Sequence, residues 1–414
     1  MVYVINKQGQ ALMPTERFGK VRRLLKNSLA HVVCRIPFTI QLDYDTTDYT
    51  QPVSLGVDAG SKHIGISATT SDKELYAADV ELKNDIVDKL STRREQRRTR
   101  RSRLRYRKAR FNNRVSSKRK GWLAPSVENK IQTHLTVVEK IHKFLPITNI
   151  VVEIASFDIQ KINNPIISGS EYQQGEQLDF FNVREYVLFR DNHTCQHCKG
   201  KSKDKVLNVH HIESRKTGGD SPKNLITLCE TCHKAYHRGE FKLNIKRGKS
   251  FRDSAFMGIM RWSFYDRLKN IYPNVSMTFG YITKNTRITN NLPKEHYVDA
   301  RCISGNPTAK PLGYYFYQKK VRCQNRQIHK ANFLKGGRKK LNQAPFLVKG
   351  FRLFDLVEYQ KDLYYIFGRR DSGFFDIRKL NGTKVNKGSI NCKHLRLIAT
   401  RKSILIEKRM QVNL

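Results

Sequence analysis

Residues 55–60 read Leu-Gly-Val-Asp-Ala-Gly, a short apolar run that ends in a carboxylate and a glycine. A run of this length, bounded by small residues, predicts a buried β-strand with Asp58 at its carboxyl end. Two further apolar runs follow, at residues 64–69 and 74–80, with a Ser-Asp turn signal between them. The sequence therefore predicts a three-stranded meander that presents an acidic side chain at the end of its first strand.

Two later segments carry acidic side chains in a similar position. Residues 150–153 read Ile-Val-Val-Glu, so that Glu153 ends a second buried run, where acids are rare. His296 and Asp299 are three positions apart and would share one face of a helix. Converging carboxylates repel one another unless divalent cations neutralise them, and Mg²⁺ is the oxygen-seeking choice. Such a centre would suit phosphodiester cleavage.

The segment between these acids is rich in cysteine. Four of the eight cysteines form two Cys-x-x-Cys pairs separated by 30 residues: Cys195, Cys198, Cys229 and Cys232. Four thiolates in this arrangement are the closed tetrahedral ligand set of a structural Zn²⁺. The remaining cysteines are scattered, so this is the usage of a metal site and not of a disulfide framework.

Histidines lie between and beside the cysteine pairs. His210 and His211 would face opposite ways on a strand, whereas His233 and His237 would share one face of a helix. A hydrolytic metal needs neutral imidazoles that leave open positions, and a separate base that activates water. His210 with His233, and His237 as a further candidate, could hold the metal, with His211 as the base. A structural zinc knuckle is the alternative, but it would need only the cysteines.

The chain is strongly basic. Its 414 residues hold 78 Lys plus Arg against 36 Asp plus Glu, a formal net charge of +42. This surplus exceeds what solubility requires and favours a phosphate backbone as partner, because each neutralised phosphate releases counterions. A ribosomal-type packing protein or a binder of anionic membranes is the alternative that composition leaves open. No apolar run approaches the roughly 20 residues that cross a bilayer, so we expect no membrane span and a cytoplasmic location.

The densest positive charge lies at residues 93–110, which hold ten Arg and one Lys with Glu95 as the only acid. A helix of this charge would repel itself and needs a nucleic acid against it, unless it is a solvated linker. The candidate nucleic-acid-binding side chains are Arg93, Arg94, Arg97, Arg98, Arg100, Arg101, Arg103, Arg105, Arg107 and Arg110.

Helical spacing and strand runs suggest the rest of the fold. Residues 126–144 place apolar side chains on one helical face, with Ser126 as a plausible N-cap. Short apolar runs with basic residues predict β-rich modules at residues 1–50 and from about residue 311 onward, the latter as a small barrel.

The cysteine- and histidine-rich block resembles the HNH nuclease family. The matching residues are Val-His-His-Ile at 209–212, Gly-Gly at 218–219, Asn224-Leu225, and Leu-Cys-Glu-Thr-Cys-His at 228–233. The resemblance implies a ββα-metal domain in which His211 is the general base and His210 and His233 bind Mg²⁺. It also implies that Asn224 orients the base through its loop.

The acidic segments at residues 55–60, 150–153 and 296–300 resemble the three split motifs of a RuvC-like, RNase H-fold nuclease. This resemblance implies a second catalytic centre that consists of Asp58, Glu153, His296 and Asp299. Asp58, Glu153 and Asp299 would bind Mg²⁺ there.

The order of these parts resembles the IscB family, transposon-encoded RNA-guided RuvC/HNH endonucleases that are ancestral to the single-effector CRISPR nucleases. Leu-Met-Pro at residues 12–14 is similar to the Pro-Leu-Met-Pro signature of their N-terminal module, with Ala11 in place of the first proline. The implied fold is a multidomain α/β chain: an RNase H-like (RuvC) domain split by an arginine-rich bridge helix and an inserted HNH domain, with small basic β-rich modules at both ends. The expected domains are the N-terminal module (1–50), RuvC part I (51–90), the bridge helix (91–120), RuvC part II (121–160), the HNH domain with its zinc site (161–245), RuvC part III (246–310) and the C-terminal barrel (311–414).

The IscB resemblance also implies partners and an activity. A large noncoding guide RNA, the omega RNA, would pair with one strand of a target DNA duplex that carries a short adjacent motif. The HNH centre would cut the paired strand and the RuvC centre the displaced strand, in a complex with one copy of the protein. A protein-guided HNH homing or restriction nuclease is one alternative. A nonenzymatic RNA-binding protein, to which metal is irrelevant, is another.

Overall fold

The computed structural model describes residues 1–103, 122–154, 180, 182–214, 220–243, 245, 252–323, 329–331, 339–341 and 345–411. The chain divides into two compact units. One comprises residues 1–155 and 259–414, and the other residues 156–258, which interrupt the first in sequence. None of the helices among the described residues is long and apolar enough to cross a membrane.

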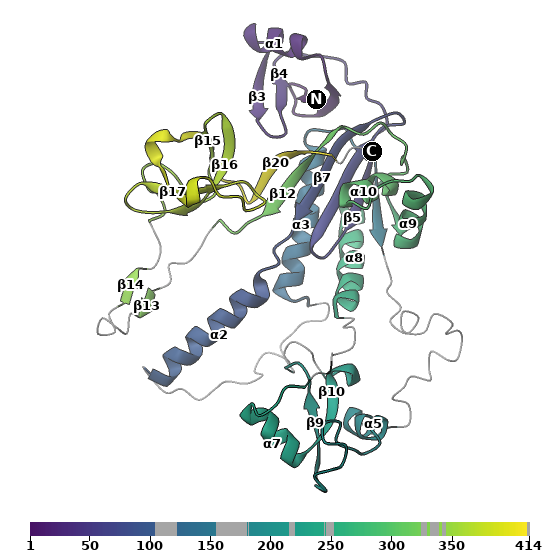
Figure 1. The fold of residues 1–414 in the computed structure, drawn as a ribbon. Helices are drawn as coiled ribbons and strands as arrows, with labels where there is room; N and C mark the ends of the chain where they lie inside the picture. The colour runs from purple at the N-terminus through teal and green to yellow at the C-terminus, as the bar shows by residue number, and fades with distance from the viewer. Residues whose placement is uncertain are drawn as a thin grey trace. The chain divides into compact units, whose positions relative to one another are not determined.

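A mixed seven-stranded sheet forms the centre of the larger unit (Figure 1). Its strands, in spatial order, are β11 (Val275–Phe279), β8 (Asn149–Ile154), β5 (Ser54–Ala59), β6 (His63–Thr69), β7 (Glu74–Glu81), β12 (Tyr314–Lys320) and β20 (Ile404–Met410). The strands β5, β6 and β7 form the predicted antiparallel meander. The strand β8 pairs in parallel with β5, and β11 in parallel with β8. The carboxyl ends of β5 and β8, with Asp58 and Glu153, therefore lie at the same edge of the sheet.

Two glycines of the sheet set the position of helix α10 (His296–Ile303). A Cβ atom at Gly56 would lie 1.9 Å from the backbone oxygen of Ala300, and one at Gly65 would lie 1.9 Å from that of His296. The helix can therefore lie directly on β5 and β6 only because both positions lack a side chain. This close approach brings the start of α10 to the end of β5 that carries Asp58.

Further helices of this unit are α2 (Ile86–Arg103), α3 (Pro125–His142) and α9 (Gly280–Thr289), together with α8 (Arg252–Ile271) from Ile259 onward. The helix α3 buries Ile131, Val138 and Ile141, as its apolar spacing predicted. The predicted N-cap, Ser126, is wrong, because the N-cap lies two residues earlier: it is Ala124, and Pro125 takes the first helical position, where its missing N–H costs nothing.

Small β-rich modules precede and interrupt the sheet. The N-terminal module pairs β2 (Ala11–Thr15), β1 (Val2–Ile5), β4 (Thr39–Leu42) and β3 (Ala30–Cys34), with helix α1 (Phe18–Lys26). The C-terminal module pairs β18 (Ile390–Asn391), β17 (Phe374–Arg378), β16 (Asp362–Arg369), β15 (Leu356–Tyr359) and β19 (Arg396–Ala399). A separate pair joins β13 (His329–Ala331) to β14 (Lys339–Leu341). The C-terminal module lies in sequence between β12 and β20, which both belong to the central sheet.

The inserted unit contains a β-hairpin with helices before and after it. Its elements are α5 (Val183–Arg190), β9 (Leu207–His211), β10 (Leu225–Cys229) and α7 (Glu230–Arg238). The strands β9 and β10 pair antiparallel, which gives a ββα arrangement with α7. Its small core consists of Ile226, Leu228 and three of the cysteines.

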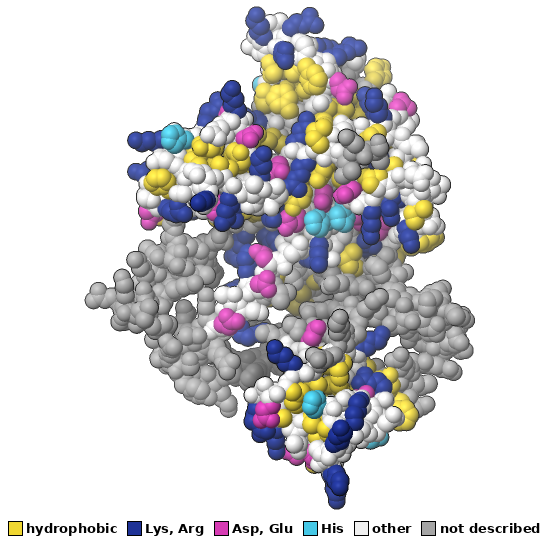
Figure 2. Space-filling model, in the orientation of Figure 1, with side chains coloured by type: hydrophobic (Ala, Val, Ile, Leu, Met, Phe, Trp, Pro, Cys, Tyr) yellow, Lys and Arg dark blue, Asp and Glu magenta, His cyan; other side chains and the backbone are white. Residues whose placement is uncertain are grey.

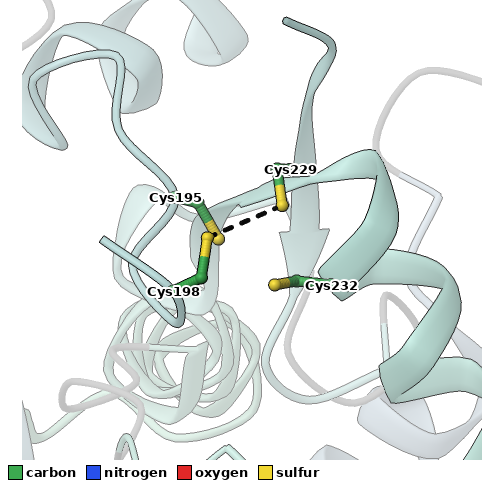
Figure 3. Close-up of side chains that lie close together, drawn as sticks. All are labelled: Cys195, Cys198, Cys229 and Cys232. Carbon is green, nitrogen blue, oxygen red and sulfur yellow. Dashed lines mark hydrogen bonds between the residues drawn. The ribbon is translucent and has the colours of Figure 1, made fainter. Parts of the chain in front are cut away.

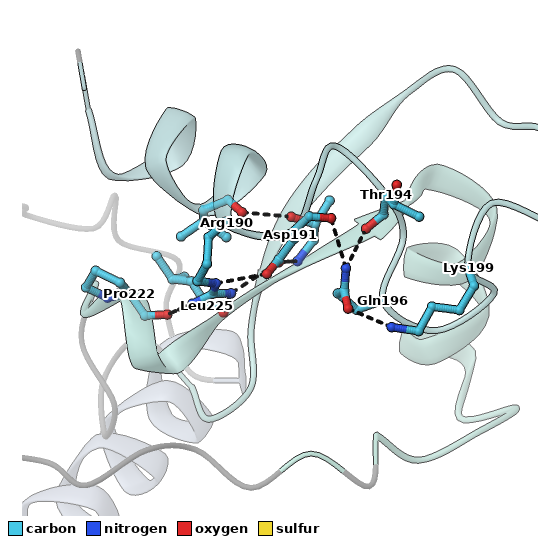
Figure 4. Close-up of polar contacts among 9 residues, drawn as sticks. Arg190, Asp191, Thr194, Gln196, Lys199, Pro222 and Leu225 are labelled. Carbon is cyan, nitrogen blue, oxygen red and sulfur yellow. Dashed lines mark hydrogen bonds and ion pairs between the residues drawn. The ribbon is translucent and has the colours of Figure 1, made fainter. Parts of the chain in front are cut away.

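Polar contacts fasten the segment before β9 to β10 (Figure 4). The Arg190 guanidinium donates to the backbone oxygens of Pro222 and Leu225, at 2.8 and 2.9 Å. The Gln196 side chain donates to the backbone oxygen of Asp191 at 3.0 Å, while the Asp191 carboxylate accepts from the backbone N–H of Thr227 at 2.8 Å. These contacts position the loop that carries the first cysteine pair.

Candidate metal centres

The four cysteines of the two Cys-x-x-Cys pairs converge in the inserted unit. Their sulfur atoms lie within 4.8 Å of one another, and Figure 3 shows the side chains pointing toward a common centre. Sγ of Cys198 is 3.8 Å from Sγ of Cys229, to which the Ser202 hydroxyl also donates, at 3.1 Å. Four converging thiols, three of them buried, fit a tetrahedral Zn²⁺ site that supplements a small core.

Three histidines converge at a second place in the same unit. His210 comes from β9, while His233 and His237 come from successive turns of α7, and their ring nitrogens lie within 4.8 Å of one another. The Nε2 atoms of His233 and His237 are 3.3 Å apart. The side chain of His210 is buried, and its Nε2 atom has no hydrogen-bond partner among the described residues. A buried nitrogen without a partner beside two other imidazoles fits a metal-ligand set.

Burial favours the uncharged form of two of these imidazoles, those of His210 and His233. Burial, followed by the neighbouring His233 and His237, lowers the pKa of His210 to about 4. Burial, followed by His237, also lowers the pKa of His233. Neutral imidazole is the form that binds metal. Nitrogen donors suit borderline divalent ions, while Mg²⁺ bound here would need water or phosphate oxygens to complete its shell.

His211 and Asn224 lie beside this cluster in different roles. The Nε2 atom of His211 is 2.9 Å from Oδ1 of Asp220, so its ring is paired with a carboxylate outside the cluster. Asn224 is fully buried, and its side chain accepts from the backbone N–H of Glu213 at 2.9 Å and donates to its oxygen at 3.0 Å. Asn224 therefore holds the loop that follows His211.

In the larger unit, the end of β5 meets the start of α10. Nδ1 of His296 lies 3.0 Å from Oδ2 of Asp58, although the two residues are 238 positions apart. This hydrogen bond is the largest cause of a raised pKa of His296. A residue that sequence reasoning missed lies against it: the His63 ring stacks on that of His296 with centroids 5.0 Å apart, and its Nδ1 is 2.8 Å from Oδ1 of Asp79.

The acids of this edge are paired with arginines. Nη2 of Arg261, from α8, lies 3.2 Å from Oε1 of Glu153 and 3.7 Å from Oδ1 of Asp58. Nε of Arg287, from α9, lies 2.9 Å from Oδ1 of Asp299. Sequence reasoning missed both arginines. A usable signal existed for one of them, because Arg261 is a lone charge among apolar residues of its helix.

Like-charge crowding is visible in the acids themselves. Burial raises the pKa of Glu153, and the neighbouring Asp58 raises it further. Burial and Asp58 likewise raise the pKa of Asp299, which Arg287 partly offsets. Within the described ranges, only the cysteine and histidine clusters bring three or more ligand atoms within 4.8 Å of one another. Oxygen donors at this edge fit a hard divalent cation, which would compete with the arginines for them.

The arginine-rich segment begins in α2, which ends at Arg103. The backbone positions of Arg93, Arg94, Arg97, Arg98, Arg100, Arg101 and Arg103 lie within this helix, whereas Arg105, Arg107 and Arg110 lie outside the described residues. The helix agrees with the expectation that this segment is helical, as far as Arg103. Elsewhere, Lys and Arg side chains are spread over the visible face of the described residues, with fewer acidic ones (Figure 2).

Two family models match the chain. A model described as RRXRR protein matches residues 2–175, which include Arg-Arg-Thr-Arg-Arg at residues 97–101. A model described as HNH endonuclease matches residues 195–239, the segment that holds both metal-ligand clusters. Both matches agree with the expected resemblance to the IscB family.

The family matches confirm part of what the sequence predicts. Residues 195–239 of the inserted unit match the HNH endonuclease family, and the chain is a mixed α/β protein of several parts. Arginine-rich and HNH segments occur in the predicted order.

Similarity to individual proteins is local. Anaredoxin from Nostoc sp. is 44% identical over 41 residues, which are 10% of this chain and 54% of that protein. Two crystal structures of Streptococcus thermophilus Cas9, in complexes with the AGAA and GGAA PAM, have TM-scores of 0.35 and 0.33 at 14% and 16% identity. Each match covers 51% of this chain and 30% of the Cas9 chain. The chain thus spans about half the length of its curated relative and under a third of Cas9.

Proposed function

We propose that this chain is an RNA-guided endonuclease that cuts both strands of a DNA duplex. The HNH centre cuts the strand that pairs with the guide, and a RuvC-like centre at the edge of the large sheet cuts the displaced strand. The observation that carries the proposal is the convergence of His210, His233 and His237 beside His211, inside a domain that matches the HNH endonuclease family.

In the HNH centre, the residues divide into a metal-binding set and a base. A divalent ion held by His210 and His233, with His237 as a third candidate, would polarise the scissile phosphate and stabilise the developing charge. His211 takes the proton from the attacking water, because its ring lies outside the cluster and its contact with Asp220 holds the ring in place. Asn224 keeps His211 in place through the loop at Glu213.

The RuvC-like assignment rests on the sheet and its acids. Residues 51–90, 121–160 and 246–310 supply β5 to β7, β8, and α8 to α10. Asp58 and Glu153 end neighbouring parallel strands, and α10 adds His296 and Asp299. Mg²⁺ at these oxygens would stabilise attack and departure at phosphorus. His296, hydrogen-bonded to Asp58, is placed to accept a proton from water.

The proposed RNA partner is supported by the charge of the chain and by the resemblance to the IscB family. A formal net charge of +42 and an arginine-rich helix suit a guide–target duplex, which a protein recognises through its backbone. Arginine also supplies bidentate contacts to phosphate. The C-terminal part of the chain, residues 311–414, would contact the RNA and a short motif beside the target, and one copy of the chain would act in the ribonucleoprotein. Mg²⁺ is the proposed ion of both centres, and Zn²⁺ that of the cysteines.

The first experiment identifies the RNA. The protein is purified from cells that carry its native flanking DNA, and the copurifying RNA is sequenced. We expect one abundant structured RNA that is encoded beside the gene and ends in a variable guide. Heterogeneous cellular RNA, or none, would contradict the RNA-guided function and favour a protein-guided HNH nuclease.

A further inference from the structure

The Arg261 guanidinium joins the two strands that carry the sheet-edge acids. Its side chain is only 6% exposed. Its Nε donates to the backbone oxygen of Ala59 at 2.7 Å, while Nη2 lies 3.2 Å from Glu153 and 3.7 Å from Asp58. The hydrogen bond to the backbone fixes the orientation of the guanidinium. Its Nη2 atom is thereby placed near both carboxylates.

The charges of this arrangement compensate one another. Asp58 and Glu153 are each at most 9% exposed, and two buried carboxylates on neighbouring strands repel each other. Arginine stays protonated at any working pH, so Arg261 is a permanent counter-cation. Removal of one partner from a buried ion pair leaves an uncompensated charge that is strongly destabilising. The acids therefore depend on a cation, and the protein itself provides one.

A divalent cation that binds Asp58 and Glu153 uses the same carboxylate oxygens that Arg261 contacts. Each bond to such an ion weakens the interaction with the guanidinium, because the two cations also repel each other. We propose that Arg261 is a positioning residue that competes with Mg²⁺ for Asp58 and Glu153, and so sets the Mg²⁺ concentration that the sheet centre requires. The effect of this competition on DNA cutting rests on the proposed function. The competition itself rests on the contacts of Arg261 alone.

The same helix offers a matched control. Arg267 also belongs to α8 and also pairs with a carboxylate, through two hydrogen bonds of 2.6 and 2.8 Å to Glu128. This pair is about one-third exposed and involves none of the sheet-edge acids. The variants Arg261→Met and Arg267→Met therefore remove the same group from the same helix, but only one of them unbalances the acids of the centre.

Thermal unfolding of the full-length chain tests the competition without any cleavage. The variants are dialysed against Zn²⁺-containing buffer and then titrated with Mg²⁺. We expect Arg261→Met to lower the unfolding temperature in the absence of Mg²⁺, and we expect added Mg²⁺ to restore it. The Mg²⁺ concentration at which half of this restoration is reached should be about tenfold lower than the concentration that gives half of the Mg²⁺-induced rise in unfolding temperature of the unchanged chain. The difference in unfolding temperature between Arg267→Met and the unchanged chain should not change with the Mg²⁺ concentration.

Two further variants keep the test decisive. If Arg261→Met does not fold, Arg261→Lys keeps one positive charge without the fork, and its Mg²⁺ midpoint should lie between the other two. Adding Asp58→Asn to Arg261→Met should abolish the Mg²⁺ response, because one of the competing carboxylates is then gone. A loss of stability that Mg²⁺ does not restore would show that Arg261 is only structural and would overturn the inference.

Strand-resolved cleavage adds the functional readout. Arg261→Met should lower the Mg²⁺ midpoint for cutting the displaced strand and leave the midpoint for the guide-paired strand unchanged. A lower rate at saturating Mg²⁺ with an unchanged midpoint would mean that Arg261 acts on the transition state, contrary to the inference. If neither strand is cut by the unchanged chain, the proposed function fails, while the unfolding titration still decides the competition.

Discussion

The histidine cluster of the inserted unit and the acidic edge of the large sheet differ in how their side chains are brought together. The three imidazoles converge within 4.8 Å without a counter-charge among them. The acids Glu153, Asp58 and Asp299 are instead each paired with an arginine, Arg261 or Arg287. Neutral donors can be packed side by side, whereas buried carboxylates require a cation. The histidine centre is therefore preorganised by packing, and the acidic centre by ion pairing.

The largest effect on cutting should come from inactivating one centre at a time. His211→Ala is expected to lower cutting of the guide-paired strand by about a hundredfold or more, because the base is lost. Asp58→Ala should do the same to the displaced strand. Strand-labelled duplex DNA measures both. Since the centres share no ligands, removal of both cuts by either variant, with DNA binding intact, would show that they are not independent.

The cysteine site should matter for folding of the inserted unit alone. Cys195→Ser should release Zn²⁺ and unfold that unit, because structural zinc sites contribute on the order of 10 kcal/mol in small domains. Metal analysis with thermal unfolding measures this, and Cys323→Ser, outside the cluster, is the control. Unchanged zinc content in the Cys195 variant would refute the site.

The donor atoms should give the centres different metal preferences. Borderline ions such as Ni²⁺ or Co²⁺ should support cutting by the nitrogen-donor centre better than by the oxygen-donor edge, where Mg²⁺ or Mn²⁺ is required. Rates on each labelled strand, measured with one ion at a time, test this. The same order of ions on both strands would contradict the contrast between the centres.

The smallest expected effect concerns His134, a histidine of α3 outside the histidine cluster. Burial lowers its pKa to about 4 from a usual value near 6.5. The folded chain then binds fewer protons than the unfolded chain between these values, so its contribution is full above pH 6.5 and is lost as pH falls toward 4. The loss should be about 1–3 kcal/mol. His134→Phe should flatten this part of the pH profile of unfolding; an unchanged profile would mean that burial does not suppress protonation here.

The strands, helices and motifs that carry the candidate site residues could be predicted from the sequence. Each of them depends on a pattern that spans only a few neighbouring residues. It did not reveal Arg261, Arg287 or His63, whose roles depend on which helix or strand lies against the acids. One signal for Arg261 was present in the sequence. It is a single charged residue between Met260 and Phe264, which are buried on an otherwise apolar helical face.

Long-range pairing was the other missing information. The strands β12 and β20 enclose the C-terminal module in sequence yet pair with each other in the central sheet. Periodicity within either strand cannot identify a partner that is more than eighty residues away. The glycines at positions 56 and 65 were visible as residues of the predicted strands, but their function, to admit α10, becomes clear only with the helix in place.

Strand-resolved cleavage by the purified ribonucleoprotein tests the central claim most directly. The chain with its copurified RNA is given Mg²⁺ and two duplexes, one matching the guide and one not, with each strand carrying its own label. We expect one cut in each strand of the matching duplex and none in the other. Equal cutting of both duplexes, or no Mg²⁺-dependent cut in either, would contradict an RNA-guided nuclease with two centres.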